Sequence, residues 1–492
     1  MSDQEMLKKE SPEAGLEAAA SEAAAAAGSV VQEASAVSSG GFVNHDPNAI
    51  YDASTLGAPK FGLLGLQHMF AMFGATVLVP ALTGIDVSTT LLFAGLGTLL
   101  FHFITKFKVP AFLGSSFAFL AGYWAIAPDG DKALLPYACF GVACAALLYF
   151  VLAALIYGFG IQRVMRFFPP VVTGPIIIAI GLNLSQSAVE NCTANWWIAL
   201  VAIAIVVIAN IWGKGMIRII PILLGVVGSY LVGAVTGNVD FSIIRDAAWI
   251  GLPLSWDQTA LSLIGHADTG LMLTAIITIV PIALATMIEH IGDISAISST
   301  VGRNYLADPG LHRTLCGDGM ATFLAALFGA PANTTYGENT GVLSLTKVYD
   351  PRVIRLAAVF AMILSFSPKV GAVITAMPTA TLGGVSLVLY GMISAVGVRN
   401  LIENKVDFTK SRNIIIAALI LVLSIGINYS TAGALSFTIG GVTISLTGLA
   451  VGALAGIILN AVLPGKDYVF DEAEAAIAVE NMSARTIDHE EK

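Results

Sequence analysis

The sequence predicts an all-α membrane protein with fourteen apolar segments, arranged as an inverted repeat of seven plus seven. Three observations predict this class. Of the 492 residues, 56% are hydrophobic and 12% are charged, and the mean hydropathy is +0.81, which is typical of chains that cross a bilayer many times. Two of the apolar segments, 110–127 and 333–347, are unusually polar and contain glycine. Each is the third segment of its set of seven, so the two halves of the chain match.

The apolar segments leave two acidic tails and one polar loop. Residues 1–59 carry a net charge of −7 and residues 466–492 a net charge of −5, whereas the middle of the chain is at +3. The expected regions are a disordered acidic N-terminal tail (1–59), a first repeat (60–236), an extracytoplasmic loop (237–270), a second repeat (271–465) and an acidic cytoplasmic C-terminal tail (466–492). The expected spans are 61–82, 89–105, 110–127, 134–158, 167–187, 195–212, 217–236, 271–297, 317–332, 333–347, 353–374, 377–397, 412–431 and 441–463.

Polar residues recur at matching places in the two halves. Gln67, in the first span, lies 50 residues before Phe117 in the third, and Glu289, in the eighth, lies 49 residues before Glu338 in the tenth. Because seven spans are an odd number, the second half enters the membrane from the opposite side. Inverted repeats of this kind are the architecture of many secondary transporters, with the site where two discontinuous segments meet.

The segment 333–347 is too short to cross the membrane as a helix. Its fifteen residues would reach about 22 Å as a helix, short of the ~30 Å hydrocarbon core. An extended first half followed by a helical second half would cover ~35 Å. We therefore expect short extended stretches in segments 3 and 10, whose backbone N–H groups line a cavity or bind a solute. The alternative is a re-entrant loop in which Glu338 is structural.

Charges in the loops predict the orientation. Loops after even-numbered spans hold fifteen Lys or Arg residues and loops after odd-numbered spans hold three, so the even loops and both tails are expected in the cytoplasm. The fifteen are Lys106, Lys108, Arg163, Arg166, Lys214, Arg218, Arg303, Arg313, Lys347, Arg352, Arg355, Arg399, Lys405, Lys410 and Arg412, and the three are Lys132, Arg245 and Lys369.

Neither a catalytic nor a metal site is indicated. The four cysteines, Cys139, Cys144, Cys192 and Cys316, make no metal-binding pattern and no disulfide framework. No nucleophile–base arrangement is evident, so an enzyme is not expected. We expect no metal, no cofactor and no nucleic-acid partner.

Two acids share one face of the eighth span. Glu289 and Asp293 are four residues apart, so their side chains are neighbours on a helix. Two buried acids cannot both stay ionised cheaply, and the pair is therefore a candidate for binding and releasing a proton during transport. For Asp293, a structural role through capping or hydrogen bonding is an equal alternative.

The broken segments bring together acceptors, donors and an aromatic face. Glu338 supplies acceptors, and Gly337 and Gly341 allow the backbone to come close to a solute. Ser115, Ser116 and Phe117 supply small donors and a flat wall. This set suits a small planar solute with alternating N–H and C=O groups, and it suits an anion poorly because carboxylates would repel it.

At this point the sequence resembles a known family. The stretch Glu338-Asn339-Thr340-Gly341-Val342-Leu343-Ser344-Leu345-Thr346-Lys347 is similar to the signature of the nucleobase–ascorbate transporters (nucleobase:cation symporter 2). Other motifs resemble the bacterial uracil permease branch, and the resemblance covers about 60–463: Gln67-His68-Met69-Phe70, Gly114-Ser115-Ser116-Phe117, Glu289-His290-Ile291-Gly292, Asp308-Pro309-Gly310-Leu311-His312-Arg313-Thr314 and Gly317-Asp318-Gly319.

The resemblance implies an architecture and an activity. Spans 1–4 and 8–11 would form a core domain, and spans 5–7 and 12–14 a gate domain. Proton-coupled uptake of a nucleobase, a homodimer and a place in the bacterial inner membrane are implied as well. Because Glu338 stands where xanthine and urate members commonly carry Gln, we expect a uracil:proton symporter. A xanthine or other purine symporter is the first alternative, and an anion exchanger or channel of the same fold is the second.

The resemblance also implies roles for single residues. Glu289 and Glu338 would hydrogen-bond the base, and the backbone at Phe117 and Gly337 would complete the pocket beside Ser116 and Tyr336. Uracil members often carry His where this chain has Asp293, so the departure concerns proton coupling rather than base binding. His68 is a further candidate for proton coupling, or alternatively a histidine satisfied in the interior. Gly317-Asp318-Gly319 is interpreted as structural, and His312 and Arg313 as part of a cytoplasmic loop.

Overall fold

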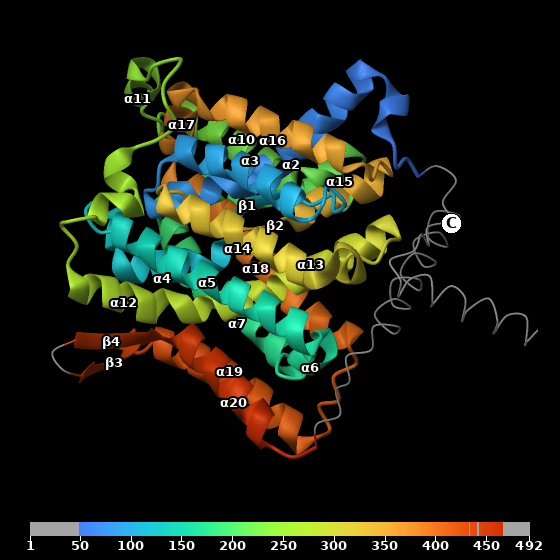
Figure 1. The fold of residues 1–492 in the computed structure, drawn as a ribbon. Helices are drawn as coiled ribbons and strands as arrows, with labels where there is room; N and C mark the ends of the chain where they lie inside the picture. The colour runs from blue at the N-terminus through green and yellow to red at the C-terminus, as the bar shows by residue number, and fades with distance from the viewer. Residues whose placement is uncertain (1–48, 432, 440–441, 466–492) are drawn as a thin grey trace, which may run out of the picture.

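The computed structural model of the chain describes residues 49–431, 433–439 and 442–465. Most of them are helical, and the long helices lie side by side across the view of Figure 1. By length and composition, seven helices of the described part could cross a membrane, or eight if α16 (Pro351–Ser365) and α17 (Pro368–Thr375), which are bent by 84°, count as one span. Four shorter apolar helices accompany them, and three of these contain 17, 15 and 15 residues: Trp196–Trp212, Pro221–Val235 and Gly448–Val462.

The first half begins with a long helix that contains the whole of the expected first span. Its elements are α2 (Ala58–Thr83), α3 (Val87–Ile104), β1 (Leu113–Ser115), α4 (Leu120–Ile126), α5 (Leu135–Phe159), α6 (Ile161–Met165), α7 (Pro170–Thr193), α8 (Trp196–Trp212), α9 (Met216–Ile219) and α10 (Pro221–Val235).

The second half follows a loop that contains α11 (Phe241–Asp246). Its elements are α12 (Thr269–Ile279), α13 (Ala283–Val301), α14 (Leu311–Leu327), β2 (Asn333–Thr335), α15 (Gly337–Thr346), α16, α17, α18 (Thr379–Glu403), α19 (Ser411–Asn428), β3 (Ala434–Ile439), β4 (Val442–Thr447) and α20 (Gly448–Val462). Pro281 lies in the short break between α12 and α13, because proline removes a helical hydrogen bond.

The two broken segments meet as a strand pair in the middle of the molecule. β1 and β2 are antiparallel, with Leu113 opposite Thr335 and Ser115 opposite Asn333. Each strand is followed by helical residues, as the length argument predicted. The pairing satisfies backbone groups that have no water partner inside a bilayer.

A threonine on a neighbouring helix holds each of these strands. Thr98 Oγ1 of α3 accepts a hydrogen bond from Leu113 N (2.9 Å) and donates one to Leu113 O (3.2 Å). Thr322 Oγ1 of α14 accepts one from Asn333 N (3.2 Å) and donates one to Asn333 O (2.9 Å). The outer edge of each strand is therefore satisfied by a side chain.

The helices pack in two groups. In the first group α3 packs against α14 and α16, α5 against α14, and α2 against α16. In the second group α7 packs against α18 and α19, α8 against α10 and α18, and α19 against α20. Small residues allow the closest approach, as is common between membrane helices. A Cβ on Gly181 of α7 would lie 2.2 Å from Tyr390 O of α18.

The last segment differs from its prediction. Instead of a continuous span over 441–463, the structure has the antiparallel hairpin β3–β4, and helix α20 begins at Gly448. The sequence of this region alternates apolar residues with serine and threonine around Gly440-Gly441, which is a hairpin signal. A search for apolar stretches alone overlooked that alternation.

Two further boundaries differ. Residues 49–59, assigned to the disordered tail, carry a 3₁₀ helix at Ala53–Leu56, and Ile50 forms a bridge with Val348; the remainder of that tail and the tail 466–492 lie outside the described residues. His312 and Arg313, expected in a loop, lie in the first turn of α14. Both prediction errors come from placing boundaries by hydropathy, which polar but packed residues do not follow.

Candidate functional site

The candidate site lies where β1 and β2 pass into helices. Phe117 and Gly337 are the first helical residues after the two strands. Because the strands are antiparallel, these positions lie at opposite ends of the short ladder. The first N–H groups of a helix lack partners within the helix and carry partial positive charge, so each end offers donors to a solute.

Space is available beside three glycines. A Cβ added to Gly337 or Gly341 of α15, or to Gly292 of α13, would meet no atom within 4 Å. Glu338, Glu289 and Asp293, which stand on the same two helices, are half-buried rather than sealed in the core. The acids predicted for the site therefore border open space.

The carboxyl groups of the site are close enough to repel one another. Glu289 experiences the charges of Asp293, Asp318 and Glu338. The helix α13 and the stretch from Asn333 to Thr346 contain no Lys or Arg. A site built in this way disfavours an anion, and it favours a neutral solute with N–H donors or a proton.

Asp293 is bound to the strand pair. Its Oδ2 accepts a 2.6 Å hydrogen bond from Thr335 Oγ1. Thr335 is the last residue of β2 and lies opposite Leu113. The sequence analysis did not single out Thr335, because a threonine in a short strand carries no signal of its own.

Phe117 and Tyr336 occupy different surroundings. Phe117 is 9% exposed and meets the ring of Tyr390 edge-on, with ring centroids 6.2 Å apart. The hydroxyl of Tyr336 donates to Ser115 O (2.9 Å) and accepts from Thr76 Oγ1 (3.3 Å). The Tyr336 side chain thus braces the strand pair, whereas Phe117 forms a wall shared with α18.

Ser116 is fully buried, and its Oγ has no hydrogen-bond partner among the described residues. Its backbone N–H donates to Ala332 O (2.8 Å) and continues the ladder. The hydroxyl is therefore the part of Ser116 that is left for another partner.

His68 connects α2 to α15. Asn339 Nδ2 donates to His68 O (3.0 Å) and lies 3.2 Å from His68 Nδ1. His68 is fully buried, and its Nε2 has no hydrogen-bond partner among the described residues. This contact next to Glu338 fixes the helical half of the broken segment.

The structure adds a buried pair, His290 and Asp318, of which only Asp318 was interpreted, as structural, from the sequence. His290 Nδ1 lies 3.0 Å from Asp318 Oδ2, and both side chains are fully buried. His290 directly follows Glu289 on α13, and Asp318 lies on α14. An acid between two glycines in an apolar helix was the available signal, because ionisable groups at membrane depth are costly.

No cluster suited to a metal is found in the described part of the chain, where groups of three or more His, Cys, Asp or Glu were sought. The four cysteines are free thiols.

Solved structures share the fold. The transmembrane domain of the cyanobacterial bicarbonate transporter BicA matches with a TM-score of 0.54 at 16% identity, covering 84% of this chain and 99% of that one. The overall structure of SLC26A9 matches with a TM-score of 0.59 at 13% identity, covering 84% of this chain and 66% of that one. At such identities the likeness concerns the fold alone.

Sequence relatives cover most of the chain. The chain is 42% identical to a uracil permease of Bacillus caldolyticus over 441 residues, covering 87% of this chain and 98% of the relative. It is 40% identical to a uracil permease of Bacillus subtilis, covering 83% and 94%, and 37% identical to one of Escherichia coli, covering 84% and 95%. Residues 60–433 match the profile of the Permease family. The chain therefore belongs to this permease family, and the resemblance to the uracil permease branch that its motifs indicated is confirmed.

Proposed function

We propose that the protein is a uracil transporter of the bacterial cytoplasmic membrane that couples uptake to protons. The observation that carries the proposal is the position of Glu289 and Glu338 beside open space, in a chain whose relatives are named uracil permeases. The relatives are permeases rather than enzymes.

The site suits a pyrimidine base. Uracil presents N–H groups that a carboxylate accepts and C=O groups that a backbone N–H serves. Glu289 and Glu338 would accept from the N–H groups, and the helix starts at Phe117 and Gly337 would donate to the carbonyl oxygens. The buried Ser116 hydroxyl is a further donor near Phe117. The ring of Phe117, held edge-on by Tyr390, offers a flat apolar face to the base.

We propose fourteen spans in two inverted repeats. The contact of α3 with α16 joins spans 2 and 11, and the contact of α5 with α14 joins spans 9 and 4. Exchanging the two halves turns one contact into the other. The contact of α8 with α10 corresponds in the same way to that of α19 with α20. The clamps of Thr98 on β1 and Thr322 on β2 add matching support.

We propose that the two packing groups belong to the core and gate domains that the resemblance implies. The first group contains spans 1, 2, 4, 9 and 11, and the second contains spans 5–7 and 12–14. The site lies on the core side, and the Phe117–Tyr390 contact reaches across to α18. A movement of one group past the other would carry the site between the two membrane faces. The homodimer is part of the proposal, and its support is the family resemblance.

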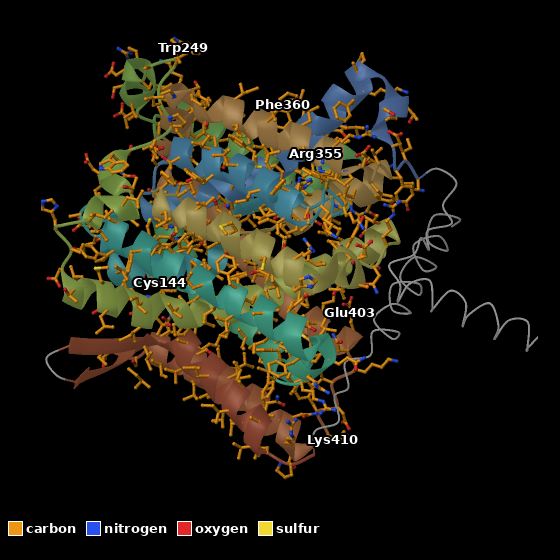
Figure 2. All side chains as sticks on the ribbon, in the orientation of Figure 1. Cys144, Trp249, Arg355, Phe360, Glu403 and Lys410 are labelled. Atoms are coloured by element: carbon orange, nitrogen blue, oxygen red, sulfur yellow. The ribbon has the colours of Figure 1, made fainter. Side chains whose placement is uncertain are left out.

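Contacts between loops support the predicted grouping of even loops on one face and odd loops on the other. Lys108, after span 2, donates to Asp308 Oδ1, after span 8 (2.6 Å). On the other side Lys369, on α17 near the end of span 11, donates to Ile244 O, after span 7 (2.7 Å). Figure 2 shows Trp249 at one end of the bundle and Glu403 and Lys410 at the other. Even loops therefore meet even loops, and odd loops meet odd loops.

The similarity of fold supports the anion-transporter alternative, because one protein that shares the fold is a bicarbonate transporter. The carboxylates beside the open space weigh against it. A competition experiment separates the candidates: uptake of labelled uracil by vesicles containing the protein is challenged with unlabelled uracil, xanthine, hypoxanthine or bicarbonate. We expect uracil to abolish the signal, the purines to compete weakly and bicarbonate not to compete. Strong competition by xanthine, or an absence of uracil uptake, would overturn the proposal.

A further inference from the structure

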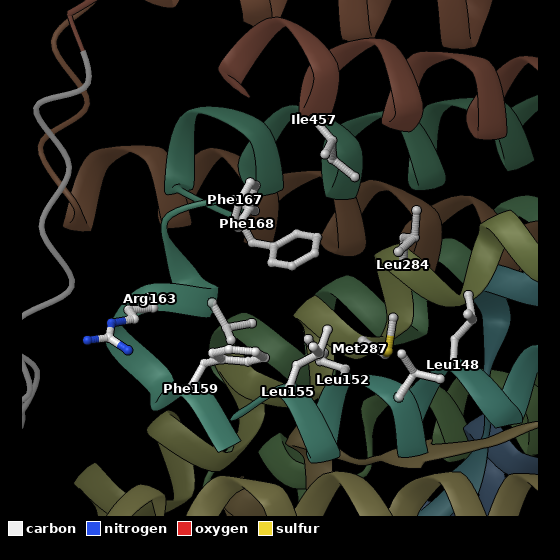
Figure 3. A pocket seen from close by; sticks show the side chains of 12 residues that line it. Leu148, Leu152, Leu155, Phe159, Arg163, Phe167, Phe168, Leu284, Met287 and Ile457 are labelled. Carbon is white, nitrogen blue, oxygen red and sulfur yellow. The ribbon is translucent and has the colours of Figure 1, made fainter. Parts of the chain in front are cut away.

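An apolar cavity opens between the two packing groups, and none of the residues assigned to the candidate site lines it. Its volume is about 530 Å³ (Figure 3). Its walls are formed by α5, α6, α13 and α20, together with Phe167 and Phe168, which directly precede α7. Eleven of its twelve lining residues are apolar, and the charged one is Arg163. A base with several N–H and C=O groups would lose its hydrogen bonds here, so the cavity is not a path for the substrate.

The cavity reaches into the protein and is more than a flat lipid-facing surface. Leu152 is 5% exposed and Met287 is 2% exposed, whereas Leu155 and Phe159 near the other end are exposed. Its apolar walls come from helices of both groups, with Leu284 and Met287 on α13 and Ile457 on α20. An apolar chain inserted there would touch the helix that carries Glu289 and the helix α20 at once.

Charge marks one end of the cavity. Figure 3 shows the Arg163 guanidinium at one end, with Leu148 at the other. Within the described residues no ion pair to Arg163 is found, and its side chain is exposed. Arg166 follows one turn later, and its carbonyl oxygen accepts a hydrogen bond from Asn460 Nδ2 of α20 (3.0 Å). Arg163 and Arg166 belong to a loop predicted to be cytoplasmic, where the leaflet is rich in anionic lipids.

We propose that this cavity binds the acyl chain of an anionic phospholipid from the cytoplasmic leaflet, with Arg163 attracting the net negative charge of its head group. The apolar slot matches the chain, and the unpaired guanidinium at its mouth matches the head group. The lipid bridges the two packing groups and so influences their relative movement. This consequence depends on the proposed transport function, whereas the lipid site itself does not.

The binding test uses the full chain, purified and stripped of lipid, and titrated with phosphatidylglycerol or with phosphatidylcholine of the same acyl chains. Bound lipid is counted by native mass spectrometry. We expect phosphatidylglycerol to bind more tightly, and Arg163→Gln to weaken it about five-fold, which corresponds to about 1 kcal/mol for one basic residue at the membrane surface. Phosphatidylcholine binding should not change.

Two variants sharpen the test. Arg218→Gln, on the exposed short helix α9 of another even loop, is the matched control and should bind phosphatidylglycerol as the wild type does. Leu155→Trp, at an exposed position near the mouth of the cavity, should narrow the cavity and weaken the binding of both lipids. Equal binding of the two lipids by the wild type, or unchanged phosphatidylglycerol binding in Arg163→Gln, would refute the site.

The functional consequence is measured separately. In vesicles containing phosphatidylglycerol, Arg163→Gln should slow uracil uptake to the rate of the wild type in phosphatidylcholine vesicles, and in the latter the two proteins should not differ. If no vesicles take up uracil, the proposed function fails while the mass-spectrometric result still decides the lipid site. Equal uptake by both proteins in both kinds of vesicle would show that the bound lipid does not influence the relative movement of the two packing groups.

Discussion

Thr335 Oγ1 donates a 2.6 Å hydrogen bond to Asp293 Oδ2 and so joins the strand pair to α13. Thr335 ends β2 directly before Tyr336 and Gly337. A change in the charge of Asp293 would therefore change its hydrogen bond with Thr335 and so affect the start of α15, where Glu338 lies. The Thr335 hydroxyl can donate to Asp293 as a carboxylate or accept from Asp293 as a carboxylic acid. The hydrogen bond can therefore persist whether or not Asp293 is protonated.

We expect Thr335→Val to impair transport while Thr335→Ser preserves it. The valine keeps the shape and removes a hydrogen bond to a charged group, a loss of about 1.5–3 kcal/mol. Uptake rates measured across a range of external pH give the test, and the profile of the valine variant should shift. Thr334→Val is the matched control on the adjacent strand position. A valine variant with the wild-type profile would show that the contact is only structural.

Glu338→Gln should weaken uracil binding while the protein still inserts. The substitution replaces one carboxylate oxygen by an NH₂ donor, so one N–H of the base loses its acceptor. This costs about 1–3 kcal/mol, or about 5- to 150-fold in affinity. Equilibrium binding of labelled uracil to the purified protein measures this. Glu190→Gln, at an exposed position of α7, should bind as the wild type does. Unchanged affinity in Glu338→Gln would remove this residue from the site.

Much of the site's framework could be predicted from the sequence, because its elements obey local physical rules. The segment 333–347 is too short for a spanning helix, which requires extended residues, and β2 followed by α15 has this form. The spacing of Glu289 and Asp293 similarly places both on α13. The length of a segment and the period of an α-helix were sufficient to predict these elements.

Other features depend on contacts between distant parts of the chain. The edge-on contact of Phe117 with Tyr390 joins residues 273 positions apart and has no local signature. The pair of His290 and Asp318 depends on how α13 and α14 face each other, so Asp318 was interpreted as structural. The hairpin β3–β4 was overlooked because hydropathy averaged over a window hides an alternation of period two.

Labelling of introduced cysteines should follow the predicted orientation. In a variant without the four native cysteines, a reagent that does not cross the membrane should label Ser255→Cys in the loop 237–270 from outside. It should not label cysteines placed beside Arg163 or Lys405 until the membrane is made permeable. The contacts of even loops with even loops, such as Lys108 with Asp308, support this expectation. Labelling in the reverse pattern would invert the proposed topology.

The N-terminal strap formed by residues 49–57 should stay attached throughout the physiological pH range. Hydrogen bonds from the Ser54 side chain and backbone, and then Arg352, lower the pKa of Asp52 to about 2. The contact is therefore complete above the ordinary pKa of about 4 and is lost only as the pH falls toward 2.

Hydrogen–deuterium exchange tests the strap. Once corrected for the intrinsic dependence of exchange on pH, protection of residues 49–57 should be equal at pH 5 and pH 8 in the wild type. Arg352→Gln, which removes the ion pairs with Asp52 and Asp350, should reduce protection at both. A wild-type change between pH 5 and pH 8 would mean that other groups control the strap, and that it contributes to any pH dependence of uptake.

Asp293 should carry the coupling proton, so that uracil uptake is driven by an inward proton gradient and falls as external pH rises. Asp293 and Glu289 lie one turn apart on α13, both half-buried, near Glu338. Burial and mutual repulsion disfavour the doubly charged state, so a proton from outside relieves the repulsion and leaves Glu289 free to accept from the base. Release of that proton inside restores the repulsion and weakens the site.

Asp293→Asn mimics the protonated acid while its amide still has an oxygen to accept from Thr335. It should therefore bind uracil at least as tightly as the wild type and exchange labelled for unlabelled base, yet lose gradient-driven accumulation. If Asp293→Asn accumulates uracil with the wild-type pH dependence, the coupling proton resides elsewhere, and Glu289 and Glu338 become the next residues to change.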